Sequence, residues 1–312
     1  MNAPVQPTTD APSCLLCGKP TELLYPSNVP ANTAIESKEI ACTSPYLSLH
    51  DDIFNCRQCR LARSVPAGIE NIEELYRNVD DADYLTSEPE RRLDFGSALE
   101  WIEAHPLVGK PGSLLEIGSS YGLFLEEAVL RGWDVVGIEP GQGAAERCQS
   151  KGMDVFNGML EEFDADGRRF DVVASWDVWE HLEDPVRALD IAHRLLRPDG
   201  LLVITTVNMG GIMAKVLGGR WPWYMRMHLH YFTRQSLTEM VRRAGFDVLR
   251  LSTQPKTLKL GYLLTRAQGL FGPISSAARA AAGWLGLDGR PVSINTGDII
   301  LIEARRVEPP PP

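Results

Sequence analysis

The sequence is poor in three features, and each absence narrows the class of protein. No stretch reaches the roughly 20 uninterrupted apolar residues that a membrane-spanning helix needs. Residues 1–12 have neither the basic start nor the apolar run of a secretory signal, so we expect a disordered lead and a cytoplasmic location. Positive charge is also short, since 31 Lys and Arg against 41 Asp and Glu give a net charge of −10. Such a chain is not drawn to a phosphate backbone, and nucleic acid is not the expected partner.

Cysteine is scarce too, yet its spacing is informative. Six cysteines occur in 312 residues, and four of them form two Cys-x-x-Cys pairs: Cys14, Cys17, Cys56 and Cys59. In a reducing compartment such pairs more often hold a metal than form disulfides, and tetrahedral zinc takes four thiolates. We therefore predict a structural zinc ion in a small domain over residues 13–68, with no vacant position for chemistry. Cys42 has no assigned role, and Cys148 is expected to pack inside a helix.

From Gly112 onward, short apolar runs alternate with helical patterns, which is the signature of βα units in a parallel sheet. The predicted strands are 113–117, 134–138, 154–156, 170–175, 201–206, 246–251 and 298–304. This order predicts a doubly wound, Rossmann-like α/β domain over residues 112–305, with a seven-stranded sheet behind the small N-terminal zinc-binding domain. Residues 69–111 are expected to form a helical connector, 252–296 an insertion and 306–312 a tail.

The first predicted strand runs directly into a turn that contains glycine. Gly118 and Gly122 let the backbone approach a ligand closely, and Glu116 lies at the end of the strand. A dinucleotide fingerprint would have the pattern GxGxxG, whereas these glycines are four residues apart. Glu139 ends the next strand, where a carboxylate can accept hydrogen bonds from ribose hydroxyls. The two strands together predict a nucleotide-type ligand.

The stretch from Glu116 to Gly122 resembles ExGxGxG, motif I of class I S-adenosylmethionine-dependent methyltransferases, with Ser120 in place of the middle glycine. Residues 157–161 are similar to the loop that lines the adenine in that family. Residues 170–182 resemble its fourth-strand motif, including the Glu-His-Leu turn of small-molecule methyltransferases, and 195–200 resemble its LKPGG-like turn. A lone glycine-rich turn is weak support, but five motifs in order over 112–251 are much stronger.

This resemblance implies a class I methyltransferase domain with S-adenosylmethionine as its cofactor. The cofactor-binding residues that it implies are Glu116, Gly118, Ser119, Ser120, Tyr121, Gly122, Glu139, Pro140, Met159, Leu160 and Trp176. The four-cysteine domain ahead of it is similar to that of sugar methyltransferases in deoxysugar pathways. In those C-methyltransferases a further C-terminal domain normally follows, for which this chain is too short, so C-methylation of a nucleotide sugar is not expected.

Methyl transfer to a hydroxyl benefits from a base that removes the proton. His181 follows the fourth strand at the carboxyl edge of the sheet, where open α/β folds bind ligands. His228 lies in residues 207–231, a segment expected to close over that edge. A histidine titrates near neutrality, so we predict His181 as the first catalytic candidate and His228 as the second, with Asp177 or Glu180 orienting the base. Hydrogen bonding of either histidine to loop backbone is the alternative.

The leading hypothesis is therefore O-methylation of a sugar, a glycan or another small-molecule hydroxyl. Two alternatives stay open. Some ribosomal RNA methyltransferases begin with a four-cysteine zinc ribbon, but residues 1–70 contain five Lys or Arg and seven Asp or Glu, a poor surface for RNA. The other is a non-catalytic adaptor whose zinc module binds a protein, against which the intact Glu116, Gly118 and Glu139 argue.

Two segments could shape the acceptor site. The aromatic run 221–224 is either a platform for a sugar ring or an apolar chain, or simple packing of the covering segment. Residues 256–287 combine apolar side chains with isolated basic residues, which is typical of a helix in a membrane interface. We expect peripheral membrane contact there, or else a helical pair that covers the acceptor pocket or forms a dimer contact.

Overall fold

The central element of the computed structural model is a seven-stranded sheet with the strand order β10-β13-β8-β7-β4-β5-β6. The structure describes residues 10–30, 33, 35, 39, 41, 43, 44, 46–66, 72–79, 81–271 and 273–307. The strands of this sheet are β4 (Ser113–Ile117), β5 (Asp134–Glu139), β6 (Val155–Asn157), β7 (Phe170–Trp176), β8 (Leu196–Val207), β10 (Phe246–Thr253) and β13 (Ile299–Arg306). Cys42 and most of the predicted lead and tail lie outside the described residues.

Strands β4 to β8 pair parallel with one another, and β13 pairs antiparallel with both β8 and β10, so β13 runs opposite to the other six strands. The predicted Rossmann-like class with seven strands is therefore confirmed, as a mixed sheet. Strand β8 begins at Leu196, earlier than predicted, because Phe170 pairs with Leu196 and the register then shifts to Val172 with Leu201. The predicted turn residue Asp199 lies in this irregularity with a φ of 59°.

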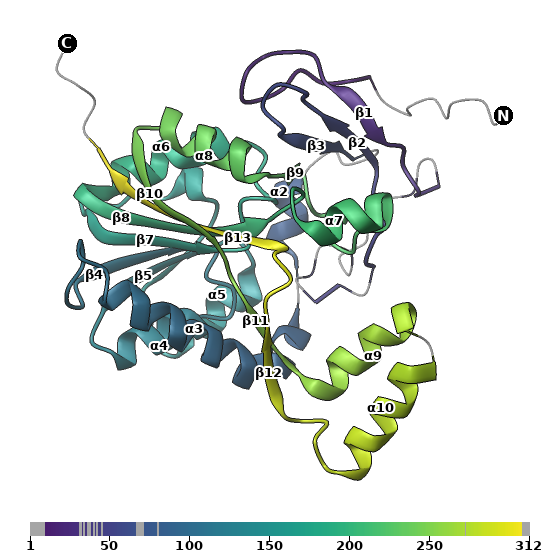
Figure 1. Cartoon of the computed structure of the whole chain (residues 1–312). Coiled ribbons are helices and arrows are strands. Elements are labelled where there is room, and N and C mark those ends of the chain that lie inside the picture. The colour runs from purple at the N-terminus through teal and green to yellow at the C-terminus, as the bar shows by residue number, and fades with distance from the viewer. Residues whose placement is uncertain are drawn as a thin grey trace.

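Helices cover both faces of the sheet (Figure 1). One layer contains α3 (Glu88–Glu103), α4 (Leu123–Leu130) and α5 (Gln142–Ser150), and the other contains α6 (Pro185–Leu195) and α8 (Arg234–Arg243). Helix α6 begins at a proline, and the side chain of Asp184 caps it by accepting hydrogen bonds from Val186 N and Arg187 N. Each layer encloses its own apolar core against the sheet.

The N-terminal region forms a second, four-stranded sheet with the order β1-β2-β3-β9. Strands β1 (Glu22–Tyr25), β2 (Asp52–Asn55) and β3 (Ala62–Val65) come from the N-terminal region itself, but β9 (His230–Tyr231) lies far along the chain, within the larger domain. Ala62 pairs with Tyr231 and Arg63 with His230. The small module is thus joined to the larger domain by backbone pairing, next to α7 (Ile212–Leu217) in Figure 1. The predicted domain boundaries remain a prediction.

The insertion forms a separate hairpin that projects from the larger domain (Figure 1). The short helices are α2 (Ile72–Arg77), η1 (Ala82–Ser87), η2 (Leu160–Glu162) and η3 (Gly218–Arg220). In the insertion, β11 (Lys256–Lys259) pairs with β12 (Pro291–Ile294), and α9 (Leu260–Phe271) packs on α10 (Pro273–Trp284). Within the described part of the chain, none of the helices has the length and apolar character to cross a membrane.

Candidate active site and zinc site

The bend after β4 is built from residues with left-handed backbone. Gly118 has a φ of 76°, Ser120 of 47° and Gly122 of 77°, and α4 begins directly afterwards. A Cβ atom at Gly118 would lie only 2.5 Å from Cγ2 of Val178, which follows β7. Glycine is therefore required at 118 both by its backbone conformation and by the space. The contact with Val178 was not predicted, because no local pattern relates the ends of two strands.

Glu139 is fixed against this bend. Its Oε2 accepts a hydrogen bond from Ser120 N at 2.6 Å, and its Oε1 accepts one from Gly141 N at 2.8 Å. Burial raises the pKa of Glu139 to about 7, although these two N–H groups act to lower it. The predicted ribose-binding carboxylate thus lies at the same sheet edge as motif I. A cavity of about 390 Å³ lies nearby, lined by Arg77, Asn78, Val79, Tyr121, Gln142, Gly143 and Glu146.

Buried polar atoms at the bend show whether a polar ligand fits there. Glu116 Oε2, Ser119 Oγ and Trp176 Nε1 are buried and have no hydrogen-bond partner among the described residues. Burial, and secondly the charge of Glu139, raise the pKa of Glu116 well above its usual value. An unsatisfied buried polar group costs about 1–3 kcal/mol. These predicted residues therefore fit a ligand that is rich in donors and acceptors, such as S-adenosylmethionine.

The remaining predicted cofactor residues have more varied surroundings. The ring of Tyr121 stacks on that of Tyr84, and its hydroxyl accepts a hydrogen bond from Asp81 N at 3.1 Å. Pro140 O accepts a hydrogen bond from the side chain of Asn157 at 3.1 Å. Met159 is half-buried, while Leu160 is buried in the apolar core and lines a different cavity, of about 310 Å³. Residues 116–122 and 139–140, with Trp176 at the end of the neighbouring strand β7, are thus the part of the predicted set that meets at one edge.

Glu180, His181 and His228 converge beyond the end of β7. Each of them has one potential ligand atom within 4.8 Å of the other two, and the two imidazole rings are 4.7 Å apart between centroids. Burial lowers the pKa of His181 to about 4 and that of His228 well below its usual value. The two predicted histidines therefore do lie together. They are neutral near pH 7, and each is a weaker base than an unperturbed histidine.

The backbone of Asp177 hydrogen-bonds His181, but the Asp177 carboxylate has other partners. It has a φ of 56°, and its Oδ1 accepts a hydrogen bond from Thr205 Oγ1 at 2.8 Å. Its Oδ2 pairs with the ammonium group of Lys256 in the insertion. Burial acts to raise the pKa of Asp177, but the charge of Lys256 outweighs it and lowers that pKa. Of the two carboxylates considered from the sequence, Glu180 is the one in the histidine cluster.

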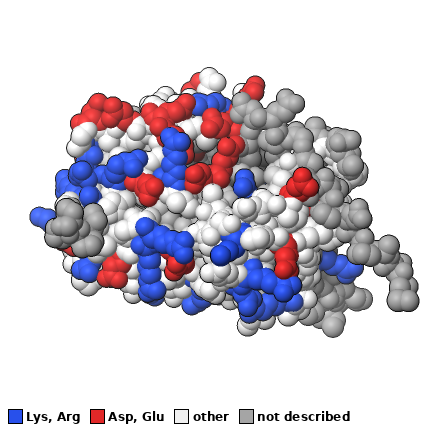
Figure 2. All heavy atoms as spheres, turned by 90° about the horizontal axis from the view of Figure 1, so that it is seen from above, with Lys and Arg blue, Asp and Glu red and all other residues white. Residues whose placement is uncertain are grey.

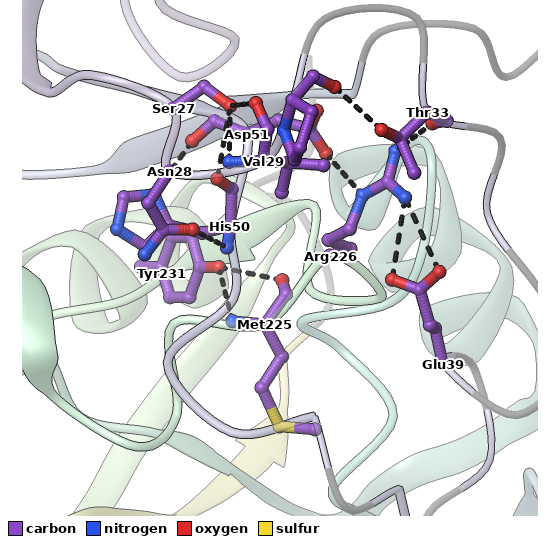
Figure 3. Close-up of polar contacts among 11 residues, drawn as sticks. Ser27, Asn28, Val29, Thr33, Glu39, His50, Asp51, Met225, Arg226 and Tyr231 are labelled. Atoms are coloured by element: carbon purple, nitrogen blue, oxygen red, sulfur yellow. Dashed lines mark hydrogen bonds and ion pairs between the residues drawn. The ribbon is translucent and has the colours of Figure 1, made fainter.

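The N-terminal module holds the segment that contains His228. Leu229 N and His230 N donate to Glu180 O at 2.7 and 3.0 Å, just before β9 pairs with the module. Arg226, whose side chain is 1% exposed, reaches into the module (Figure 3). Its Nε donates to Asp51 Oδ2 at 3.0 Å, and its other nitrogens contact Glu39 and the carbonyl of Thr33. Sequence analysis did not predict this buried arginine, because its acidic partners are far away along the chain.

The aromatic run 221–224 is mostly packing. Trp221 is fully buried and donates from Nε1 to Asp298 Oδ1 at 3.0 Å, and Tyr224 is buried in the same apolar cluster. Trp223 is half-buried and lies roughly parallel to the ring of His228, with 6.4 Å between centroids. A platform made of the whole run is therefore wrong, and Trp223 is the member next to the histidine cluster.

The two Cys-x-x-Cys pairs meet as predicted. Their four sulfur atoms all lie within 4.8 Å of one another, in Cys14, Cys17, Cys56 and Cys59. Cys17 Sγ and Cys56 Sγ are 3.6 Å apart, close to the roughly 3.8 Å that tetrahedral Zn–S bonds of about 2.3 Å give. After each pair, Gly18 and Arg60 adopt positive φ and their N–H groups donate to Cys14 O and Cys56 O. This donor set fits zinc. Cys148 is buried on α5, in agreement with the prediction that it packs inside a helix.

Residues 88–251 match the model of the methyltransferase domain family. A ubiquinone biosynthesis O-methyltransferase of Cereibacter sphaeroides is 32% identical over 147 residues, which cover 43% of this chain and 60% of the relative. One of Azorhizobium caulinodans is 34% identical over 152 residues, which cover 45% of this chain and 60% of the relative. This chain thus spans about three fifths of the length of these curated relatives.

A solved structure agrees with the architecture. It is a complex of the Haloferax volcanii Trm112 methyltransferase activator with a protein described as a methyltransferase. The matched chain has a TM-score of 0.52 at 14% identity, and the match covers 78% of this chain and all of that one. This likeness shows the fold. The family match extends from α3 into β10 and includes the bend, Glu139 and His181. The chain therefore belongs to the methyltransferase domain family and has the class I methyltransferase fold.

Proposed function

We propose that this protein transfers a methyl group from S-adenosylmethionine to a hydroxyl oxygen of a small molecule. The observation that carries the proposal is that two groups of residues lie at the same edge of the sheet. The glycine bend with Glu116 and Glu139 forms one group, and the cluster of Glu180, His181 and His228 forms the other. The relatives named as O-methyltransferases support oxygen as the acceptor atom.

The bound cofactor would supply a methyl group on a positively charged sulfur, so the protein has mainly to hold the acceptor oxygen in line with that group. Glu139 would accept the ribose hydroxyls, while Glu116, Ser119 and Trp176 would satisfy their buried polar atoms on the ligand. His181 and His228 would bind the acceptor hydroxyl. Asp177, whose carboxylate contacts Thr205 and Lys256, would form part of the wall of the acceptor site.

The acceptor could be a sugar hydroxyl, as the sequence first suggested, or a ring hydroxyl of the kind that the names of the relatives suggest. Burial of Trp221 and Tyr224 removes most of the platform expected for a sugar, so we favour the ring hydroxyl. Labelled S-adenosylmethionine should be incubated with the full chain and matched panels of sugars and hydroxylated aromatic compounds. An O-methylated product would support the proposal. Label found only in RNA or protein would contradict it.

Zinc in the four-cysteine site is part of this proposal, with a structural role. The RNA alternative is less favoured, because the face in Figure 2 intersperses basic with acidic side chains and shows no continuous basic surface among its described residues. The adaptor alternative requires a pocket that does not bind the cofactor. A cytoplasmic location also remains a prediction.

Peripheral membrane contact through residues 256–287 is a further hypothesis. Trp284 is 87% exposed and Leu285 58% exposed at the end of α10. Large exposed apolar side chains of this kind can enter a membrane interface. Flotation with anionic vesicles tests the idea, with Trp284→Ser as the variant expected to lose association. Absence of wild-type flotation would reject it.

A further inference from the structure

The cluster of Glu180, His181 and His228 has the donor set of a metal site. Two imidazoles and one carboxylate bring a ligand atom each to within 4.8 Å of one another. This set is different from the four thiolates of the N-terminal module, because nitrogen and oxygen donors suit a catalytic zinc, iron or manganese ion, whereas four thiolates form a closed structural site. Three protein ligands leave coordination positions open.

Hydrogen bonds to the backbone orient the rings of both histidines. His228 Nδ1 lies 2.8 Å from Trp223 O, while His181 Nδ1 lies 3.1 Å from Met227 O and 3.0 Å from the hydroxyl of Tyr76. When Nδ1 donates its proton to a carbonyl, the lone pair is on Nε2. Among the described residues, no hydrogen bond to His228 Nε2 is found, whereas the ring of His181 also hydrogen-bonds the backbone of Asp177. Metal-binding histidines usually show this arrangement, in which the second nitrogen donates to a backbone carbonyl.

Glu180 is oriented in the same manner. Its side chain is almost fully buried, and Oε2 accepts a hydrogen bond from Thr206 Oγ1 at 2.7 Å. Its backbone oxygen accepts from Leu229 N and His230 N, which fixes the distance between Glu180 and the loop that carries His228. Lys256, whose charge also acts on Glu180, is already paired with Asp177, so a buried carboxylate beside two imidazoles still lacks a positive charge of its own. A bound cation would supply that charge.

We propose that Glu180, His181 and His228 bind a divalent transition-metal cation, and that its open positions receive the hydroxyl of the methyl acceptor. The second half rests on the proposed function. There, the hydroxyl proton leaves to solvent, the oxygen forms a bond to the methyl carbon, and the carbon–sulfur bond of the sulfonium breaks. The cation lowers the pKa of the bound hydroxyl, so that the proton can leave without a strong base nearby.

The binding test uses the full-length protein with its thiolate site already filled by zinc. It is titrated with Co²⁺, followed by visible absorption, and separately with Mn²⁺, followed by the loss of the free-ion electron paramagnetic resonance signal. We expect one additional ion per chain, with a Co²⁺ spectrum that lacks thiolate charge-transfer bands. His228→Gln should weaken binding by at least about tenfold, and Thr206→Val, which leaves all three ligands in place, by about tenfold.

His193→Gln is the matched control, because this histidine lies on α6 and contacts Val307 O, away from the cluster. It should bind like the wild type. Failure of the wild type to bind either ion, or equal binding by folded His228→Gln protein, would overturn the metal site. If the ion binds but no hydroxyl is methylated, the proposed function fails alone. If methylation persists after the ion is removed, the role assigned to the cation fails alone.

Discussion

Arg226 offers the sharpest test of how the two parts of the chain are joined. Its guanidinium is 1% exposed and contacts two carboxylates of the module, Asp51 at 3.0 Å and Glu39 at 3.4 Å. Arg226→Ala would leave both carboxylates buried without this partner. Loss of one member of a buried ion pair costs about 3–5 kcal/mol, so the equilibrium constant for unfolding should rise about 100-fold or more.

Arg168→Ala is the matched control, because Arg168 pairs with Asp154 at 3.2 Å while their side chains are 50% and 60% exposed. A surface pair of that kind contributes only about 0–1 kcal/mol. Urea unfolding followed by tryptophan fluorescence measures both variants. Hydrogen exchange should also become faster at Leu229 and His230, which connect the module to Glu180. If the two variants differ by less than about 1 kcal/mol, the buried network does not hold the module in place.

Three further predictions concern the cofactor and zinc sites. Gly118→Ala should abolish binding of S-adenosylhomocysteine, because the new Cβ atom would clash with Val178. Gly109→Ala is the control, since Gly109 has a similar φ of 70° but open space around it, and this variant should still bind the ligand. Calorimetry measures both affinities, and equal values would refute the clash. Affinity for the same ligand should rise from about pH 6 to about pH 8, because Glu139 ionises near 7 and only its carboxylate accepts two hydroxyls, and Glu139→Gln should flatten this profile. Cys59→Ser, or a strong chelator, should release zinc and lower the melting temperature, as metal analysis and calorimetry would show; an unchanged melting temperature would argue against a structural ion.

The sheet could be predicted from the sequence because its signal is local. Alternating apolar runs and helical patterns identify each βα unit, and Pro185 indicates where a helix begins. Strand β9 could not be found this way, since its two residues form a strand only by pairing with β3. Its length is too short for any periodic pattern.

The site shows the same difference between local patterns and contacts of distant segments. Motif I and Glu139 are contiguous patterns, so the sequence identified them, and the Glu-His-Leu turn identified Glu180 and His181. The position of His228 depends on backbone hydrogen bonds to Glu180 and on the burial of Arg226, which are contacts between distant segments. The sequence therefore suggested a histidine base, whereas the structure brings a carboxylate and two neutral imidazoles together.

Calorimetric titration of the folded, zinc-containing chain with S-adenosylhomocysteine tests the central claim most directly, because it asks only whether the bend after β4 holds the cofactor. The account predicts saturable binding of one ligand per chain, with a rise in melting temperature on addition of the ligand. No heat of binding together with an unchanged melting temperature would contradict the cofactor site and favour a non-catalytic adaptor.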